Sequence, residues 1–235
     1  MYRGYKIAIV IPCYKVSEII NKVIKNLPKF IDHVYVVDDR CPENSVKKIR
    51  SKSKRIKKIY RNVNGGVGAA VKDGYRLSIY DKNDITVRVD GDGQMDLRLI
   101  KYFIDPIIDK KAFFTKGNRF KDLYFIKKMP ILRIIGNIFF SLIGNLITKN
   151  FKVFDFLNGY TAISNFALKK VLKKKLDDDY YFDTILIYQL NNLKFKILDI
   201  PMKAKYENEK SNINELKTGI SFILKNVLFL LGIKK

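Results

Sequence analysis

Short apolar runs alternate with stretches of helical spacing over the first 90 residues of the chain. The runs Ile7 to Ile11 and Val34 to Val37 are typical of strands buried on both faces. A third, shorter strand is expected from Ile56 to Tyr60 and a fourth from Ile85 to Val89. Helices are expected between them, at residues 17–27, 43–54 and 69–79. This order predicts an α/β fold with a mostly parallel sheet, because parallel strands need helical crossovers.

The pattern is less regular after residue 96. Helices are expected at residues 96–109, 129–149, 165–172 and 182–191, and strands near 112–115, 155–164 and 195–200. No linker-like or low-complexity stretch divides the chain. We therefore expect one domain over residues 1–215, followed by a short apolar C-terminal helix over 216–235.

Polar residues and residues of special geometry stand where three of the predicted strands end. They are Pro12 and Tyr14, Asp38 and Asp39, and Asp90 and Asp92. Open α/β sheets bind ligands beyond the carboxyl ends of their strands. These residues are therefore expected to form one site.

The segment Asp90-Gly91-Asp92-Gly93-Gln94 has the composition of a metal site. Two carboxylates one residue apart can converge on a divalent cation when the backbone turns between them, and Gly91 and Gly93 permit that turn. Gln94 adds a neutral oxygen ligand. A cation held there would bridge the carboxylates to a diphosphate and neutralise charge on a departing nucleotide.

The chain carries 46 basic and 23 acidic residues, a formal net charge of +23. Such a charge predicts an anionic partner, although the Lys-, Ile- and Asn-rich composition offers a plainer explanation. Lys and Arg are densest between Lys47 and Lys58, which fits either a solvated helix face or docking on an anionic bilayer. Nucleic acid is not an expected partner, because no base-stacking or zinc-finger motif accompanies the charge.

Cysteine and histidine exclude several kinds of site. Cys13, Cys41 and His33 are the only such residues, too few for a zinc site, and His33 is expected to be a solvated loop residue. Two cysteines make no disulfide framework, which fits a reducing cytosol. The N-terminal apolar run ends at Pro12 and does not have the pattern of a signal peptide.

Two apolar segments are candidates for contact with a membrane. Over residues 131–148 a narrow polar stripe recurs every three or four residues, which favours lying in the interface over spanning. The stretch from Gly219 to Ile233 is interrupted by Lys225 and Asn226 and is shorter than the roughly 20 residues that cross a bilayer. No complete membrane anchor is expected, and both segments also fit core helices or a homodimer surface.

Several short motifs in order give the chain a family resemblance. They are Pro12-Cys-Tyr14, Val36-Val-Asp-Asp39, Asn64-Gly-Gly-Val-Gly68, Asp90-Gly-Asp-Gly-Gln94, Gly117-Asn-Arg119, Asp155-Phe-Leu-Asn-Gly-Tyr160, Tyr181-Phe-Asp183, Ile200-Pro201 and Tyr206-Glu-Asn-Glu-Lys-Ser211. Together they resemble family 2 glycosyltransferases, in the branch that contains dolichyl-phosphate mannose synthase. The resemblance covers roughly residues 6–213.

The resemblance implies a GT-A fold with a Rossmann-like sheet, a GDP- or UDP-sugar donor, Mg²⁺ or Mn²⁺, and transfer with inversion. For the nucleotide, it implies that Pro12 and Tyr14 line the base and ribose pocket, that Asp39 accepts a hydrogen bond from the base, and that Asn64 and Gly66 shape the floor beside it. For the diphosphate and the metal, it implies that Asp90, Gly91 and Asp92 contact the donor, that Asp90, Asp92 and Gln94 hold the metal, and that Arg119 faces phosphate. It further implies that the acceptor or a closing loop is served by Asn158, Tyr206, Lys210 and Ser211. Lys15 and Val16 depart from the Asn-Glu pair usual in the family, which leaves the preferred base open.

The acceptor end of the reaction stays open at this point. A polyprenyl phosphate, which the resemblance favours, presents an oxygen that is already anionic, whereas a sugar hydroxyl of a growing cell-surface glycan must lose a proton to a base. Asp183 is the candidate base, and Asp177 to Asp179 fit a solvated helix cap. A non-catalytic nucleotide-sugar-binding relative is the alternative of a different class. A peripheral position on the cytoplasmic face of a membrane fits the basic and apolar segments together.

Overall fold

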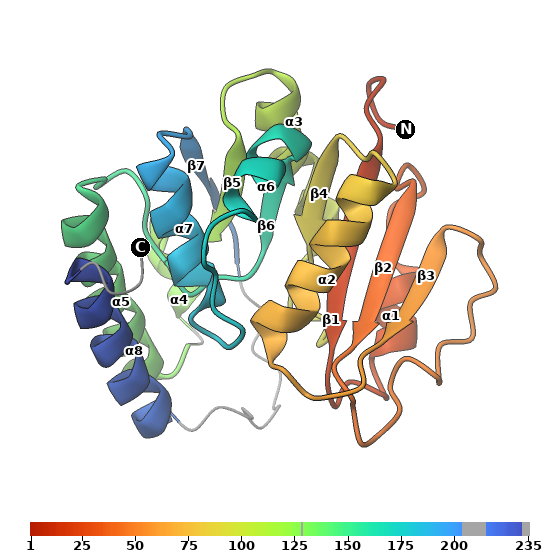
Figure 1. The fold of residues 1–235 in the computed structure, drawn as a ribbon, viewed down its shortest axis with the longest axis horizontal. Helices are drawn as coiled ribbons and strands as arrows, with labels where there is room; N and C mark the ends of the chain where they lie inside the picture. The colour runs from red at the N-terminus through yellow and green to blue at the C-terminus, as the bar shows by residue number, and fades with distance from the viewer. Residues whose placement is uncertain (128, 204–214, 232–235) are drawn as a thin grey trace.

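The computed structural model describes residues 1–127, 129–203 and 215–231. Its centre is a seven-stranded sheet of order β3-β2-β1-β4-β6-β5-β7 (Figure 1). The strands are β1 (Ile7–Cys13), β2 (His33–Asp38), β3 (Ile56–Tyr60), β4 (Ile85–Arg88), β5 (Phe114–Asn118), β6 (Thr161–Ser164) and β7 (Ile197–Pro201). Only β6 runs against its neighbours, so the expectation of a mostly parallel α/β sheet is confirmed.

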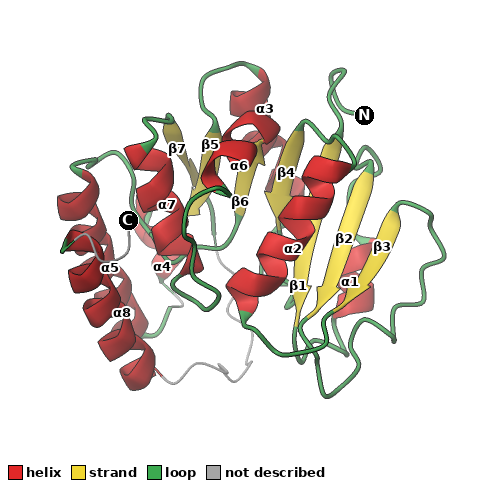
Figure 2. Ribbon diagram, viewed as in Figure 1, coloured by secondary structure: helices red, strands yellow, loops and turns green. Residues whose placement is uncertain are grey.

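Helices cover both faces of this sheet (Figure 2). They are α1 (Ile20–Lys25), α2 (Val67–Tyr80), α3 (Ile100–Ile108), α4 (Leu123–Ile126), α5 (Ile131–Thr148), α6 (Asn165–Val171), α7 (Phe182–Asn192) and α8 (Glu215–Leu230), with short 3-10 turns at Leu97–Leu99 and Arg119–Lys121. Alternate side chains of β1 enter two separate cores. Ile7, Ile9 and Ile11 pack with α1 and α3, whereas Ala8 and Val10 pack with α2, α6 and α7.

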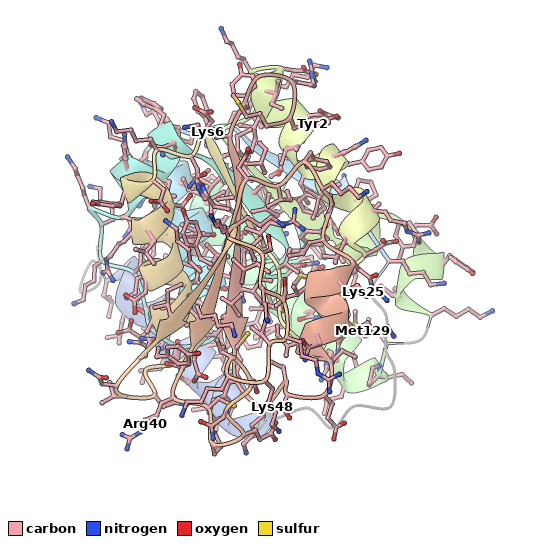
Figure 3. The ribbon with its side chains drawn as sticks, turned by 90° about the vertical axis from the view of Figure 1, so that its right-hand side faces the viewer. Tyr2, Lys6, Lys25, Arg40, Lys48 and Met129 are labelled. Carbon is pink, nitrogen blue, oxygen red and sulfur yellow. The ribbon has the colours of Figure 1, made fainter. Side chains whose placement is uncertain are left out.

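The basic segment after β2 is not a helix, contrary to the sequence expectation for residues 43–54. Residues 41–55 form turns and irregular backbone. The side chain of Asn21 on α1 bonds the Lys48 carbonyl at 3.0 Å and the Arg50 amide at 2.9 Å, so backbone groups are satisfied without a helix. Arg40 and Lys48 project at the lower edge of the molecule, where β1 and β2 end (Figure 3).

Helix α5 carries its polar stripe on the inside. Asn137, Ser141, Asn145 and Thr148 are buried, while the apolar side chains of Ile131, Leu132, Ile135, Leu142 and Leu146 are each at least half exposed. The stripe faces the protein because its polar groups bond backbone there: Ser141 Oγ accepts from the Asp155 amide at 3.0 Å. The polar stripe of α5 therefore faces the protein, and the outward face of α5 is apolar.

Helix α8 is part of the same body and packs against α5, as the ring contact between Phe140 and Phe222 shows. Its outward residues are apolar too, with Ile220 and Leu224 more than half exposed. The pair α5 and α8 lies at one end of the molecule, and β3 with the basic segment lies at the other (Figure 1). The basic segment and the apolar helices are therefore separated by the width of the sheet.

Candidate active site

The turn that follows β4 places Asp90 and Asp92 at the carboxyl end of the sheet. Gly93 takes φ +75°, a conformation that favours glycine, and the Gln94 amide donates to Asp92 Oδ1 at 3.0 Å. Gly91 lies against the end of β1, where a Cβ atom would stand 3.3 Å from the Pro12 carbonyl oxygen. The expected meeting of the β1 and β4 ends at one site is thus observed.

A buried arginine joins two of the predicted site carboxylates. Arg88, in β4, donates to Asp90 Oδ1 from Nε at 3.2 Å and from a terminal nitrogen at 3.1 Å, and it also pairs with Asp183 of α7. Burial raises the pKa of Asp183, which the Arg88 guanidinium opposes and the Asp90 carboxylate reinforces. Asp183 therefore lies close to Asp90, as the sequence predicts for a site residue. Its carboxylate is occupied by the ion pair with Arg88.

The donor atoms of the turn suit a hard divalent cation. Asp90, Asp92 and Gln94 offer only oxygen ligands, the kind that Mg²⁺ and Mn²⁺ prefer. No group of three or more His, Cys, Asp or Glu residues able to hold a metal occurs among the described residues. A cation at the turn would be held by one or two carboxylates and completed by substrate phosphate and water.

Asp39 organises the glycine-rich turn before α2. Its carboxylate accepts from the Gly65 amide at 2.9 Å and the Gly66 amide at 2.8 Å, and it pairs with Arg61 at 2.6 Å. Gly66 takes φ +92°. The structure therefore shows that Asp39 fixes this turn. That Asp39 also accepts a hydrogen bond from a nucleotide base remains a prediction.

The other residues predicted for the donor pocket are more open. Tyr14 lies 39% exposed just beyond β1, and Asn64 is exposed at the start of the glycine-rich turn. Pro12 is partly buried at the end of β1. Their side chains are therefore accessible at the carboxyl ends of the strands, as a nucleotide pocket requires.

Arg119 is held by Asp155, a carboxylate with no role expected from the sequence beyond its place in a family motif. It donates to Asp155 Oδ2 from Nε at 2.7 Å and pairs with Oδ1 at 2.5 Å. Asp155 is fully buried; burial acts to raise its pKa, but Arg119, with help from Lys116, lowers it. Asn158 donates to Asp155 Oδ2 at 3.1 Å, so Arg119 and Asn158 share one anchor.

The group of Arg119, Asp155 and Asn158 adjoins the pair of Arg88 and Asp90 through Gly159. A Cβ atom there would stand 2.7 Å from an Arg88 nitrogen and 3.1 Å from Asp90 Oδ2. The Asp155–Tyr160 loop thus runs from Arg119 to the turn over residues 90–94, and the structure brings both groups of predicted residues into one region. Tyr206, Lys210 and Ser211 lie outside the described residues.

The acidic segment before α7 is only in part the solvated helix cap that the sequence predicts. Asp178 and Asp179 are exposed, and Asp179 Oδ1 accepts from the Tyr181 amide at 2.9 Å. The Asp177 side chain is only 8% exposed and lies 2.7 Å from Lys225 of α8, which also pairs with Asp179. Asp178 pairs with Lys72 of α2 at 2.6 Å. The segment therefore joins α2 to α8. Its lysine partners gave no local signal in the sequence, because Lys72 lies 106 residues before Asp178 and Lys225 lies 48 residues after Asp177.

Comparisons with known proteins agree with this geometry. The model of glycosyl transferase family 2 matches residues 8–172. UDP-N-acetylglucosamine--dolichyl-phosphate N-acetylglucosaminyltransferase of Methanococcus voltae is 30% identical over 219 residues, which cover 85% of this chain and 86% of that protein. An uncharacterized protein of Methanocaldococcus jannaschii is 26% identical over 226 residues, covering 95% of this chain and 91% of that protein.

Solved structures agree in fold. Glucosyl-3-phosphoglycerate synthase from Mycobacterium tuberculosis, crystallised with Mn²⁺, UDP and glucosyl-3-phosphoglycerate, superposes with a TM-score of 0.72 at 16% identity and covers 96% of this chain and 79% of that one. The GT-A fold expected from the sequence is thereby confirmed. The chain belongs to glycosyl transferase family 2 and is a glycosyltransferase of the dolichyl-phosphate-related branch.

Proposed function

We propose that this glycosyltransferase moves a sugar, with inversion, from a nucleoside diphosphate donor to a polyprenyl phosphate, with Mg²⁺ or Mn²⁺ as cofactor. The observation that carries the proposal is the turn that sets Asp90 and Asp92 beside the end of β1. The Mn²⁺ and UDP of the Mycobacterium tuberculosis structure support the donor and the metal. The dolichyl-phosphate acceptor named for the Methanococcus voltae relative supports the acceptor.

Each end of the site then has a role. When bound, the cation would neutralise charge on the departing diphosphate. Tyr14 and Pro12 would flank the base and ribose, and the turn fixed by Asp39 would form the floor beside them. Arg119, aimed by Asp155, would face phosphate, where a preorganised guanidinium is most effective.

The state of Asp183 favours a phosphate acceptor over a hydroxyl acceptor. Its carboxylate is paired with Arg88 and the residue is only 7% exposed. A proton acceptor must reach the proton that it removes, and this carboxylate is engaged elsewhere. A phosphate oxygen is already ionised near neutral pH and needs no such base.

Transfer assays with two acceptors test the proposal. With Mn²⁺ present, a panel of uridine and guanosine nucleotide sugars should give a glycosylated lipid with a short polyprenyl phosphate and none with the matching polyprenyl alcohol. Mass spectrometry of the lipid fraction reads both products. Transfer to a sugar hydroxyl, with the polyprenyl phosphate inert, would instead support the glycan-elongating alternative. Absence of any transfer, with nucleotide binding retained, would support a non-catalytic relative.

The outward faces of α5 and α8 support a peripheral position on an anionic membrane. By length and composition α5 could cross a bilayer, but its inner stripe is bonded to the catalytic body, as the Ser141 contact shows. Exposed Lys127 and Lys149 flank the two ends of its apolar face, where they can reach anionic headgroups. We place this face against the bilayer and, given two unbridged cysteines, on its cytoplasmic side.

Removing apolar side chains from this face should weaken membrane binding. Leu142→Ser with Leu146→Ser is expected to lower binding to vesicles containing anionic phospholipid by roughly tenfold or more, since each leucine is at least half exposed and would be buried on docking. Flotation of vesicles measures it. Tyr102→Ser, at an exposed position on α3, is the matched control and should bind as the wild type does. Unchanged vesicle binding, with a dimer lost in sedimentation, would assign the face to a homodimer.

A further inference from the structure

Two consecutive residues of α8 bind the side chains that flank Tyr180 in the sequence. Lys225 pairs with Asp177 at 2.7 Å and with Asp179, and its side chain is only 17% exposed. Asn226 Oδ1 accepts from the Tyr181 hydroxyl at 2.8 Å. The chain around position 180 is therefore fixed from α8, although position 180 itself is not part of that packing.

The same segment is pressed against the glycine-rich turn on its other side. The Ala69 amide donates to the Asp178 carbonyl at 3.0 Å. A Cβ atom at Gly66 would stand 2.6 Å from that carbonyl oxygen, and one at Gly68 would stand 2.7 Å from the Asp177 carbonyl oxygen. Because there is no room for movement toward the turn, the segment is wedged between α8 and the turn that Asp39 fixes.

Tyr180 itself remains accessible at this fixed position. It is 45% exposed, while its neighbour Tyr181 is buried. Its segment touches the glycine-rich turn through the Asp178 carbonyl, and Asp183, three residues further on, pairs with Arg88, which also bonds Asp90. Tyr180 therefore lies between the glycine-rich turn and the Asp90 side of the candidate site, where an accessible phenol can donate a hydrogen bond to a bound phosphate or sugar oxygen.

We propose that Tyr180 is a further donor-binding residue and that Lys225 is the residue that positions it. The inference rests on the proposed function, because it takes the ligand to be a nucleoside diphosphate sugar. It assigns Lys225, which interrupts an apolar helix, to the donor site rather than to solvent or headgroups. Its contact with Tyr180 is indirect and runs through Asp177 and Asp179.

Calorimetric titration of UDP and of GDP, each with Mn²⁺, tests the pair without relying on turnover. Tyr180→Phe and Lys225→Met are each expected to weaken binding of the preferred nucleotide by roughly tenfold, the loss of one hydrogen bond to a charged group. The double variant should bind no more weakly than either single variant, because an unpositioned hydroxyl contributes nothing further. Lys225→Arg should restore binding to within about threefold, since it keeps the charge that Asp177 and Asp179 bind.

Controls separate positioning from general stability. Tyr102→Phe, at an exposed tyrosine on α3, should bind nucleotide as the wild type does. A Lys225→Met protein with a lower melting temperature but wild-type affinity would overturn the inference, as would additive losses in the double variant. A wild-type protein that binds neither nucleotide would overturn the proposed function and the inference with it, so the two failures are distinguishable.

Discussion

Replacing Asp92 by alanine or by asparagine is expected to lower metal-dependent transfer by roughly a thousandfold, the loss of several kcal/mol of charge stabilisation at the leaving group. The two variants are expected to differ in how well they keep the turn over residues 90–94. Asparagine keeps an oxygen that can accept from the Gln94 amide, whereas alanine removes it. Asp92→Asn should therefore fold with wild-type stability, and Asp92→Ala should lose about 1 kcal/mol at most.

The rate of transfer as a function of Mn²⁺ concentration measures this effect, and electron paramagnetic resonance of free Mn²⁺ measures binding directly. Asp109→Asn is the control, because it removes one carboxylate charge from a surface position paired with Arg3. It should transfer at the wild-type rate. An Asp92→Asn protein with full activity and unchanged Mn²⁺ binding would remove the metal site from this turn.

The features that sequence could predict are those with a local physical cause. The buried strand runs before Pro12, Asp38 and Asp90 identify three parallel strands, and the residues that follow them must then share one edge of the sheet. The glycines around Asp92 likewise indicate a turn from composition alone. These expectations agree with the structure because each depends on residues that are close in the chain.

The features that sequence could not predict depend on distant partners or on which side of an element is covered. A periodic stripe on α5 is the same pattern whether its polar or its apolar side faces inward. Bonds to distant groups, such as the Asp155 amide on Ser141 and the Asn191 side chain on the Thr148 carbonyl, make the polar side the inner one. The segment after Cys41 is not a helix, and two of its backbone groups instead form hydrogen bonds with the Asn21 side chain. Arg88 was visible as a charge inside an apolar run, but its partner Asp183 lies 95 residues away.

Arg88→Met is expected to lower the free energy of unfolding by about 3–5 kcal/mol, because it leaves the buried Asp183 carboxylate without its counter-ion and beside Asp90. Urea denaturation measures this loss. Adding Asp183→Asn removes the uncompensated charge, so the double variant should recover about 2 kcal/mol of it. Arg76→Met, at an exposed arginine paired with Asp73, should change stability little.

The pH dependence of the single variant distinguishes a buried charge from a packing defect. Burial already raises the pKa of Asp183 in the native protein, and removing Arg88 takes away the main influence that lowers it. A carboxyl whose pKa is higher in the folded state binds more protons there than in the unfolded state, so its contribution to stability grows as the pH falls. The stability deficit of Arg88→Met should therefore shrink as the pH is lowered from neutral into the mildly acidic range. A deficit that is constant over this range, and equal in the double variant, would mean that Arg88 acts through its volume and not through its charge.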